Sequence, residues 1–178
     1  MSDIYLRAMN IEDIYLTHKW HNDEDLYKTL VGPFRFVSTD AEKEWIKNKT
    51  TFSNQEINLM ICLTETTDPI GLISVRDINW PSRIGHLTGI FIGEKKFRGH
   101  GFGTKALNLL IEHCFDDLGL NRIWAYILSE NQASISMFKK CGFIVEGKLR
   151  QHAFKNGRFV DVIFVGLCAD QYFKKTIK

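Results

Sequence analysis

A glycine-rich turn is the part of the sequence whose residue types point most clearly to chemistry. The segment 98–104 reads R-G-H-G-F-G-T and lies between a predicted strand and a predicted helix. Glycine at alternate positions gives the backbone conformations that other residues avoid, and it lets a ligand approach the main chain closely. Successive N–H groups at the start of a helix then point into one concavity that suits phosphate, and Arg98 adds further donors. The alternative interpretation is a loop whose glycines only turn a corner.

Two nucleotide-binding patterns compete for this turn. A phosphate-binding loop of the Walker type needs Lys followed by Ser or Thr after its last glycine, whereas Gly103 is followed by Thr104 and Lys105 in the opposite order. The segment 101–106 does match G-x-G-x-x-A, the dinucleotide fingerprint. Its context is unfavourable, because the seven residues 93–99 intervene after the preceding strand. A dinucleotide-binding oxidoreductase is therefore the third-ranked hypothesis.

A second segment decides between these patterns. Residues 131–143 read N-Q-A-S-I-S-M-F-K-K-C-G-F, follow a predicted strand and end in a Gly-Phe pair. Together with the R-G-x-G-x-G turn, this segment resembles the acetyl-CoA-binding core of the GNAT superfamily of N-acetyltransferases, over about residues 70–143 and more loosely over the whole chain. The W-x-N-D motif at 20–23 and the segment 146–161 resemble the branch that contains ribosomal-protein N-terminal acetyltransferases and spermidine N-acetyltransferases.

The resemblance implies a place for coenzyme A. It predicts that parallel strands at 87–92 and 122–128 diverge, with the pyrophosphate on the main chain of the glycine turn and the pantetheine amides paired with the edge of the first strand. Asn131 would contact the pantetheine arm or only cap its helix, and Lys140 would contact the adenosine phosphate or only carry a solvated charge. The expected cofactor contacts are Phe91, Ile92, Arg98, Gly99, His100, Gly101, Phe102, Gly103, Thr104, Asn131, Ser134, Phe138 and Lys140.

Direct transfer of an acetyl group needs a neutral amine, a proton acceptor and a proton donor. An alkylammonium of pKa ~10.4 costs roughly 4–5 kcal/mol to deprotonate at pH 7, so a base is expected within reach. The resembled family often has a Tyr acid where this chain has Phe138, and a carboxylate where it has Leu87. Ser134 is the next candidate acid unless it only caps the helix. His86 is the candidate base, although strand alternation places it on the face opposite Leu87. Further candidate bases are Asp77 and Glu130.

The acceptor is expected between the N-terminal helices and the C-terminal hairpin, which flank the cleft in the resembled family. The acidic run 23–25 would receive a cationic amine or form a solvated loop. Because the formal net charge is only +2, the chain shows no acidic bias toward a polyamine. The residues expected to bind the acceptor are Trp20, Asn22, Asp23, Trp80 and His152; His21, Phe34 and Phe154 are further aromatic or polar residues of these elements.

The apolar periodicity predicts an α/β (α+β) fold, with one domain over residues 1–178 and helices on both faces of a mixed sheet that splays at the coenzyme A site. Asn156-Gly157 between two long strands is a strong hairpin signal. The predicted strands cover residues 4–9, 57–63, 70–78, 84–92, 122–128, 143–155 and 158–168. The predicted helices cover residues 11–20, 25–30, 39–50, 104–117 and 131–141.

Composition bounds the remaining possibilities. The chain has 178 residues, 44% hydrophobic and 25% charged, which is typical of a soluble globular domain and unlike disordered, collagen-like or disulfide-rich chains. A net charge of +2 and a pI of about 8.3 are too low for a nucleic-acid-binding domain. The four cysteines lack metal-binding spacing and are expected to be reduced. With neither a signal segment nor a ~20-residue apolar run, we expect a cytoplasmic protein without metal, membrane or nucleic-acid partner, and with a homodimer as a possible assembly.

The leading hypothesis is an acetyl-CoA-dependent N-acetyltransferase that acts on a primary amine by direct attack in a ternary complex. The amine would belong to a protein N-terminus, a polyamine or an amino sugar. The alternative is a catalytically weak or inactive module that binds or senses acyl-CoA, because Phe138 and Leu87 occupy the positions where an acid and a base are common in the resembled family.

Overall fold

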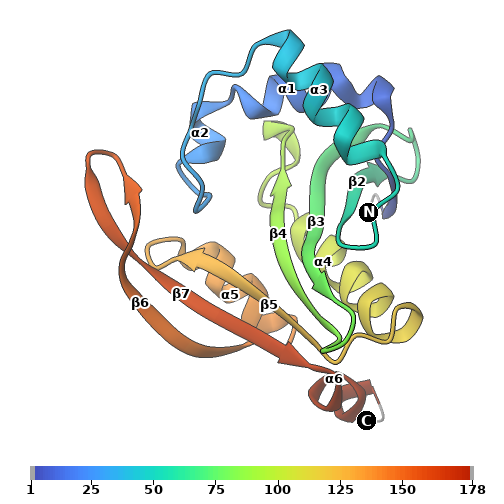
Figure 1. Ribbon diagram of the computed structural model, residues 1–178, viewed down its shortest axis with the longest axis vertical. Helices are drawn as coiled ribbons and strands as arrows, with labels where there is room; N and C mark the ends of the chain where they lie inside the picture. Colours follow the sequence, from blue (N-terminus) through green and yellow to red (C-terminus); the bar gives the residue numbers. More distant parts are fainter. Residues whose placement is uncertain (1–2, 177–178) are drawn as a thin grey trace.

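A computed structural model describes residues 3–176 as one seven-stranded mixed sheet with helices on both sides (Figure 1). The order of the strands across the sheet is β1-β2-β3-β4-β5-β7-β6. All neighbouring pairs are antiparallel except β4 and β5, which are parallel. The strands are β1 (Ile4–Ala8), β2 (Ile57–Leu63), β3 (Pro69–Asn79), β4 (Ile84–Ile92), β5 (Arg122–Leu128), β6 (Ile144–Lys155) and β7 (Arg158–Cys168).

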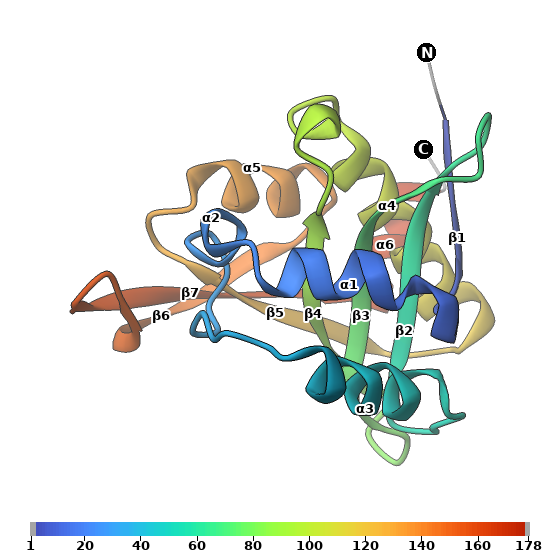
Figure 2. The same ribbon diagram turned by 90° about the horizontal axis from the view of Figure 1, so that it is seen from above.

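The helices form two layers. Figure 2 shows α4 and α5 on one side of the sheet and α3 on the other. The α-helices are α1 (Ile14–His21), α2 (Glu24–Tyr27), α3 (Thr39–Thr50), α4 (Phe102–Glu112), α5 (Gln132–Lys140) and α6 (Ala169–Thr176). Short 3-10 turns at Ile11–Asp13 and Lys95–Phe97 precede α1 and the glycine turn, and a π-helical turn at His113–Asp117 extends α4.

Strand alternation divides the apolar side chains between the two layers. Ile61 and Ile73 point to the face that α4 and α5 cover, and they belong to the larger hydrophobic cluster. Met60 and Leu72 point to the opposite face, where they pack with side chains of α1 and α3 such as Trp20. Because both faces are buried, the central strands are apolar on both sides, as expected for a sheet between helical layers.

The parallel pair at the centre of the sheet separates soon after it begins. Three residue pairs join β4 to β5, and the last of them is His86 with Trp124. Beyond His86, β4 contains a bulge, since Thr88 and Phe91 pair with β3 whereas the two residues between them do not. Gly89 lies in this bulge with φ +63°, a conformation that glycine adopts without strain. The bulge turns β4 away from β5, and this confirms the predicted splay.

Apart from one-residue shifts at element ends, the predicted elements are confirmed with four differences. The short helix expected over 25–30 covers only Glu24–Tyr27. The helix expected over 11–20 begins as a 3-10 turn, in which Arg7 binds both carboxylate oxygens of Asp13 at 2.6 and 2.8 Å. The helix expected over 104–117 starts at Phe102, because Gly101 caps it, and ends in the π-helical turn. The sequence analysis missed α6, an amphipathic helix whose Tyr172 stacks on Phe115 with ring centroids 5.1 Å apart.

Candidate active site

A cavity of about 900 Å³ opens where β4 and β5 diverge. Its walls come from the chain that follows α2, from β4 beyond His86, from the glycine turn, from the middle of β5 and from one face of α5. Within the described residues, the edge of β4 that faces β5 has no strand partner beyond His86, so main-chain groups of this edge remain available to an extended ligand.

The glycine turn has the backbone that the sequence predicted. Gly99 and Gly101 have φ +81° and +83°, and a Cβ at either position would extend into open space. Gly101 is also the N-cap of α4, so the first N–H groups of this helix lie at the cavity wall. Gly103 instead needs its small size, because a Cβ there would lie 3.1 Å from the sulfur of Met137 on α5. These features fit a phosphate group on the main chain of the turn.

Arg98 does not present the free fork of donors that we expected from the sequence. Its Nε donates to the carbonyl oxygen of Ile92 at 2.8 Å, and one terminal nitrogen donates to the carbonyl of Gly93 at 2.9 Å. The same nitrogen lies 3.2 Å from the carboxylate of Asp23, which is the N-cap of α2. Arg98 therefore closes the end of β4 and anchors α2, and it lines the cavity together with Gly99, Gly101 and Gly103.

Two further predicted cofactor contacts, His100 and Phe102, are not among the residues that line the cavity in the described part of the chain. His100 is exposed, and a ring nitrogen lies 3.0 Å from the carbonyl oxygen of Arg98. Phe102, the first residue of α4, is only 7% exposed and packs in the larger hydrophobic cluster. The other predicted contacts line the cavity: Phe91, Ile92, Gly99, Gly101, Gly103, Thr104, Asn131, Ser134, Phe138 and Lys140.

The start of α5 shows the capping role of Asn131, one of the two interpretations given for it, together with a contact to the chain after α2. Its side-chain oxygen accepts a hydrogen bond from the N–H of Ser134 at 3.0 Å, so Asn131 caps the helix. Its side-chain nitrogen donates to the carbonyl of Thr29, also at 3.0 Å, and so joins α5 to the chain after α2. Ser134 lies in the first turn of α5 and lines the cavity. Phe138, one turn later, is 2% exposed and packs edge-on against Phe143.

His86 lies at the point where the two central strands separate. Its imidazole stacks on Trp124 with ring centroids 3.8 Å apart, and its Nδ1 lies 3.5 Å from the carboxylate of Asp77. Burial lowers the pKa of His86 below the ordinary value, and the neighbouring Asp77 opposes this shift only in part. The ring is therefore neutral at pH 7 and able to accept a proton. As predicted, Leu87 is buried in the opposite layer, and both residues border the cavity.

None of the five predicted acceptor residues lines the cavity within the described part of the chain. Trp20 is 1% exposed and packs on Gly93, where a Cβ would lie 2.3 Å from the indole. The side chain of Asn22 binds the N–H and the carbonyl of Val37. Trp20 and Asn22 therefore hold the helical layer together.

The other three predicted acceptor residues also have partners elsewhere. Asp23 caps α2 and pairs with Arg98. Trp80 donates to the carbonyl of Asn54 at 2.6 Å, and His152 is exposed with its ring 5.6 Å from that of Tyr126.

Other side chains line the acceptor end of the cavity instead. His21 lies there, and its Nδ1 is 2.8 Å from the carboxylate of Glu42, a residue with no exposed surface. Arg76 of β3 and Tyr126 of β5 border the same space. The sequence analysis named His21 only as a further residue of the N-terminal helices and did not assign Glu42, Arg76 or Tyr126. These residues come from four elements and share no spacing pattern. The remaining lining residues on this side include Asp25, Tyr27 and Trp45.

Comparison with known proteins gives the family. The family described as acetyltransferase (GNAT) domain matches residues 3–144, and the chain belongs to it. A spermidine N(1)-acetyltransferase of Vibrio cholerae is 27% identical over 98% of this chain and 98% of its own length. An L-amino acid N-acetyltransferase of Escherichia coli is 27% identical over 93% of this chain and 98% of its own length. An N-acetyltransferase of Bacillus licheniformis, p20, is 30% identical over 94% of this chain and 93% of its own length.

The solved structures agree. A crystal structure of the Vibrio cholerae spermidine N-acetyltransferase with coenzyme A and spermine has a TM-score of 0.88, 25% sequence identity, and covers 96% of this chain and 98% of that one. Family, fold and site together show an acetyl-CoA-dependent N-acetyltransferase that acts on an amine. The dinucleotide interpretation of the glycine turn is thereby replaced. No helix within residues 3–176 is long and apolar enough to span a membrane.

Proposed function

We propose that this enzyme acetylates a small primary amine by direct transfer, with His86 as the general base and Ser134 as the general acid. The observation that carries the proposal is the position of His86. It borders the cavity at the apex of the splayed strands, and its lowered pKa keeps the imidazole neutral. Ser134 borders the same cavity from the first turn of α5.

The proposed reaction follows from this arrangement. His86 accepts a proton from the acceptor ammonium, and the neutral amine attacks the thioester carbonyl. Unpaired main-chain N–H groups on the edge of β4 donate to the oxyanion that develops on the carbonyl oxygen. The new C–N bond forms, the C–S bond breaks, and Ser134 gives its proton to the departing thiolate. The amide nitrogen then loses its second proton, which restores the Ser134 hydroxyl through water. The cavity holds both substrates side by side, so much of the rate arises from positioning.

The names of the relatives offer several acceptors. They include spermidine and L-amino acids, and one more distant relative is named a putative ribosomal N-acetyltransferase. A volume of about 900 Å³ accommodates small molecules, so we favour a small amine over a protein N-terminus. We also carry over association into a homodimer or a larger assembly as a proposal, because a structure of the Vibrio cholerae enzyme is described as dodecameric.

The first test measures binding and turnover separately. Acetyl-CoA at ~100 times a micromolar Kd should raise the melting temperature through a gain of about 2.7 kcal/mol in stability, whereas NADH should not. Release of free thiol is then followed with polyamines, amino acids, amino sugars and N-terminal peptides. If acetyl-CoA does not raise the melting temperature (the acetyl-CoA shift), the proposal fails. A shift without turnover on any acceptor supports the acyl-CoA-binding module instead.

Variants assign the two roles. His86→Gln should lower kcat by about 100-fold and leave the acetyl-CoA shift unchanged, since general base catalysis contributes roughly 10²–10⁴-fold. Ser134→Ala should lower kcat more than it weakens acetyl-CoA binding. His113→Gln is a matched control, because His113 pairs with Asp117 on the surface of the π-helical turn and lies outside the cavity lining. Equal losses of binding and turnover in Ser134→Ala would assign this residue to coenzyme A contact alone.

A further inference from the structure

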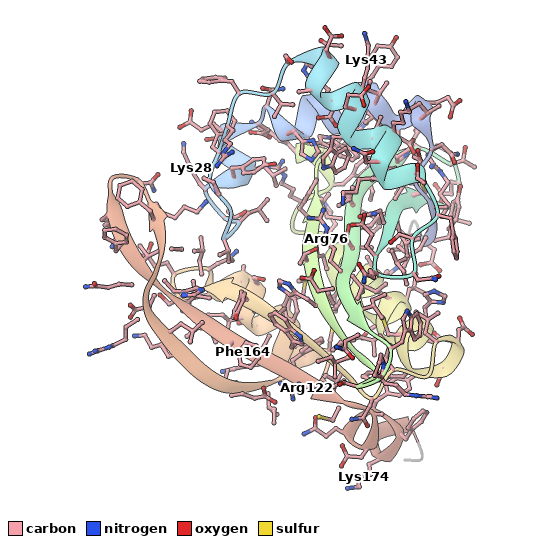
Figure 3. The ribbon with its side chains drawn as sticks, viewed as in Figure 1. Lys28, Lys43, Arg76, Arg122, Phe164 and Lys174 are labelled. Carbon is pink, nitrogen blue, oxygen red and sulfur yellow. The ribbon has the colours of Figure 1, made fainter. Side chains whose placement is uncertain are left out.

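Arg76 places an incompletely paired guanidinium group beside the proposed base. It is the residue of β3 that lies directly opposite His86 in the register with β4. Side chains of directly opposite residues lie on the same face of a sheet, with their Cβ atoms about 5 Å apart. Arg76 also lines the cavity (Figure 3, where its label lies between those of Lys28 and Phe164). The cavity therefore has a fixed positive charge next to the imidazole.

The existing partners of Arg76 do not satisfy it. Its Nε is buried and has no hydrogen-bond partner in the described part of the chain. The nearest carboxylate is that of Glu56, at 3.7 Å, which is beyond hydrogen-bond distance. Glu56 is already held by Lys49, whose Nζ lies 2.6 and 2.8 Å from its two oxygens. A buried donor without an acceptor is costly, so the pairing with Glu56 is weak and leaves the charge of the guanidinium group incompletely compensated.

The carboxylates near this end of the cavity are already paired. Asp25 accepts from Lys28 at 2.8 Å and also lies 3.4 Å from Lys95. Glu42 is fully buried and binds His21. Asp77, beside His86, is largely exposed and lies outside the cavity lining. The lining therefore contains little unpaired negative charge that could bind a second ammonium group of the acceptor. It does contain a guanidinium group that could bind an oxyanion.

We propose that Arg76 is a specificity-determining residue that binds an oxyanion of the acceptor, so that the acceptor is a small amine carrying a carboxylate or phosphate group near its amino group. The inference rests on the proposed function of His86, which fixes where the amine lies. The planar guanidinium suits two parallel hydrogen bonds to such an oxyanion. In an α-amino acid the amine and the carboxylate are attached to one carbon. The amine can therefore lie at His86 while the carboxylate lies at Arg76, the residue opposite His86 on the adjacent strand. A short amino alcohol phosphate offers the same chemistry from a second source.

Acceptor pairs that differ in the anion test this proposal. The pairs are an L-amino acid with its amide, and phosphoethanolamine with ethanolamine, with spermidine and an N-terminal peptide as further acceptors. The wild-type enzyme should have a kcat/KM about 100-fold higher for the anionic member of at least one pair, and the pair that responds identifies the source of the anion. A preference for spermidine, for the peptide or for the neutral members would overturn the proposal.

Substitutions at Arg76 test the residue itself. Arg76→Leu should raise KM for the anionic acceptor by about 100-fold, the loss expected for charge-assisted hydrogen bonds, and leave KM for its neutral partner and the acetyl-CoA shift unchanged. Arg76→Lys should retain part of the preference for the anionic acceptor, since it keeps the positive charge but lacks the planar guanidinium group that makes two parallel hydrogen bonds. Arg158→Leu is the matched control, because Arg158 pairs with Glu130 on the surface. An equal loss on both members of each pair would show that Arg76 acts only structurally.

A binding measurement separates failure of this inference from failure of the proposed function. Calorimetric titration of the enzyme–coenzyme A complex with each anionic amine needs no turnover. Binding that depends on Arg76 supports the oxyanion site even where His86→Gln has no effect on kcat, a result that would reject only the assigned base. Absence of anion-dependent binding in the wild-type protein rejects the oxyanion site, whatever amine is acetylated.

Discussion

At the scale of single residues, the lowered pKa of His86 makes stability depend on pH. Burial holds this pKa below the ordinary imidazole value in the folded state, whereas the unfolded chain titrates near ~6.5. Below that pH, the unfolded state binds more protons than the folded state, so stability falls as the pH falls through this range. His86→Gln should remove this contribution and reduce the drop in melting temperature between pH 7.5 and pH 5.5.

Thermal melts of wild-type protein, His86→Gln and His113→Gln at pH 7.5, 6.5 and 5.5 check this prediction. His113 is exposed and pairs with Asp117 on the surface, so its substitution should leave the acid-side drop unchanged. If wild type and His86→Gln lost the same stability on acidification, His86 would not be a neutral, desolvated imidazole. The same neutral form is the one required of a general base, so the melts test the assumption behind the mechanism without an acceptor.

Single residues also show which parts of a site can be predicted from sequence. Gly99 and Gly101 were recognised, because a positive φ restricts the choice of residue so strongly that it marks the sequence. The partners of Arg98 were not, since two are main-chain carbonyls and the third, Asp23, is 75 residues away. Arg76 was missed for a related reason: its role depends on the register between β3 and β4. Contacts of this kind have no periodicity.

At the scale of elements, local patterning was sufficient for the strands and for most helices. Hydrophobic alternation and the Asn156-Gly157 turn gave β2 to β7 within a residue or two, because these signals arise within each segment. The family resemblance supplied the splay of β4 from β5, and the structure adds its cause, the bulge at Gly89. The short helix α6 escaped notice, since its stability depends on docking of Tyr172 against the π-helical turn.

The turn between β4 and α4 gives a prediction at this scale. Gly101→Glu should abolish the acetyl-CoA shift, because a carboxylate at the N-cap of α4 would lie where the turn is expected to hold a phosphate. Gly157→Glu is the matched control: its φ of +77° is close to the +83° of Gly101, both sites are open, and Gly157 lies in the distant β6–β7 turn.

Both variants should melt earlier than wild type, because a side chain at positive φ costs roughly 1–2 kcal/mol. Thermal shift with and without acetyl-CoA separates this common strain from the loss of binding. Gly157→Glu should retain the full acetyl-CoA shift. An unchanged shift in Gly101→Glu would contradict the position given to the phosphate groups, and equal loss in both variants would attribute the effect to strain.

At the scale of the whole molecule, the cavity separates two arms of the sheet that meet at His86 and Trp124. One arm carries β1 to β4 with α1 to α3, and the other carries β5 to β7; α2 faces the β6–β7 hairpin across the opening (Figure 1). Within residues 3–176, side chains of the opposite arm hydrogen-bond to the segment after α2 at two places, and Val31 of that segment packs against the apolar cluster of β5 to β7. Asn131 reaches the carbonyl of Thr29, and Lys155 of β6 reaches the carbonyls of Tyr27 and Gly32. The segment 27–32 is therefore a cavity wall held from the opposite arm.

Lys155 should be the stronger of the two ties. It is 9% exposed, and burial lowers its pKa, so its ammonium group depends on the two carbonyl oxygens that it binds. Lys155→Met keeps much of the apolar stem and removes both hydrogen bonds. We expect a loss of about 2 kcal/mol in stability, since hydrogen bonds to charged groups contribute ~1.5–3 kcal/mol each and the freed carbonyls regain water. This corresponds to a decrease of roughly 4–8 °C in melting temperature.

Hydrogen exchange locates the effect of Lys155→Met. The amides of 27–32 should exchange faster in the variant, whereas those of β2 and β3, which lie within the other arm, should be unchanged. Lys148→Met is the control, because Lys148 lies on the same strand but is 57% exposed and pairs with Asp161 on the surface, a contact worth less than about 1 kcal/mol. Faster exchange throughout the sheet would mean that Lys155 supports the core, and unchanged exchange in 27–32 would mean that the arms are joined by other contacts. Faster amide exchange that is confined to residues 27–32 in Lys155→Met would identify Lys155 as the residue through which the β6–β7 hairpin fixes the acceptor side of the cavity.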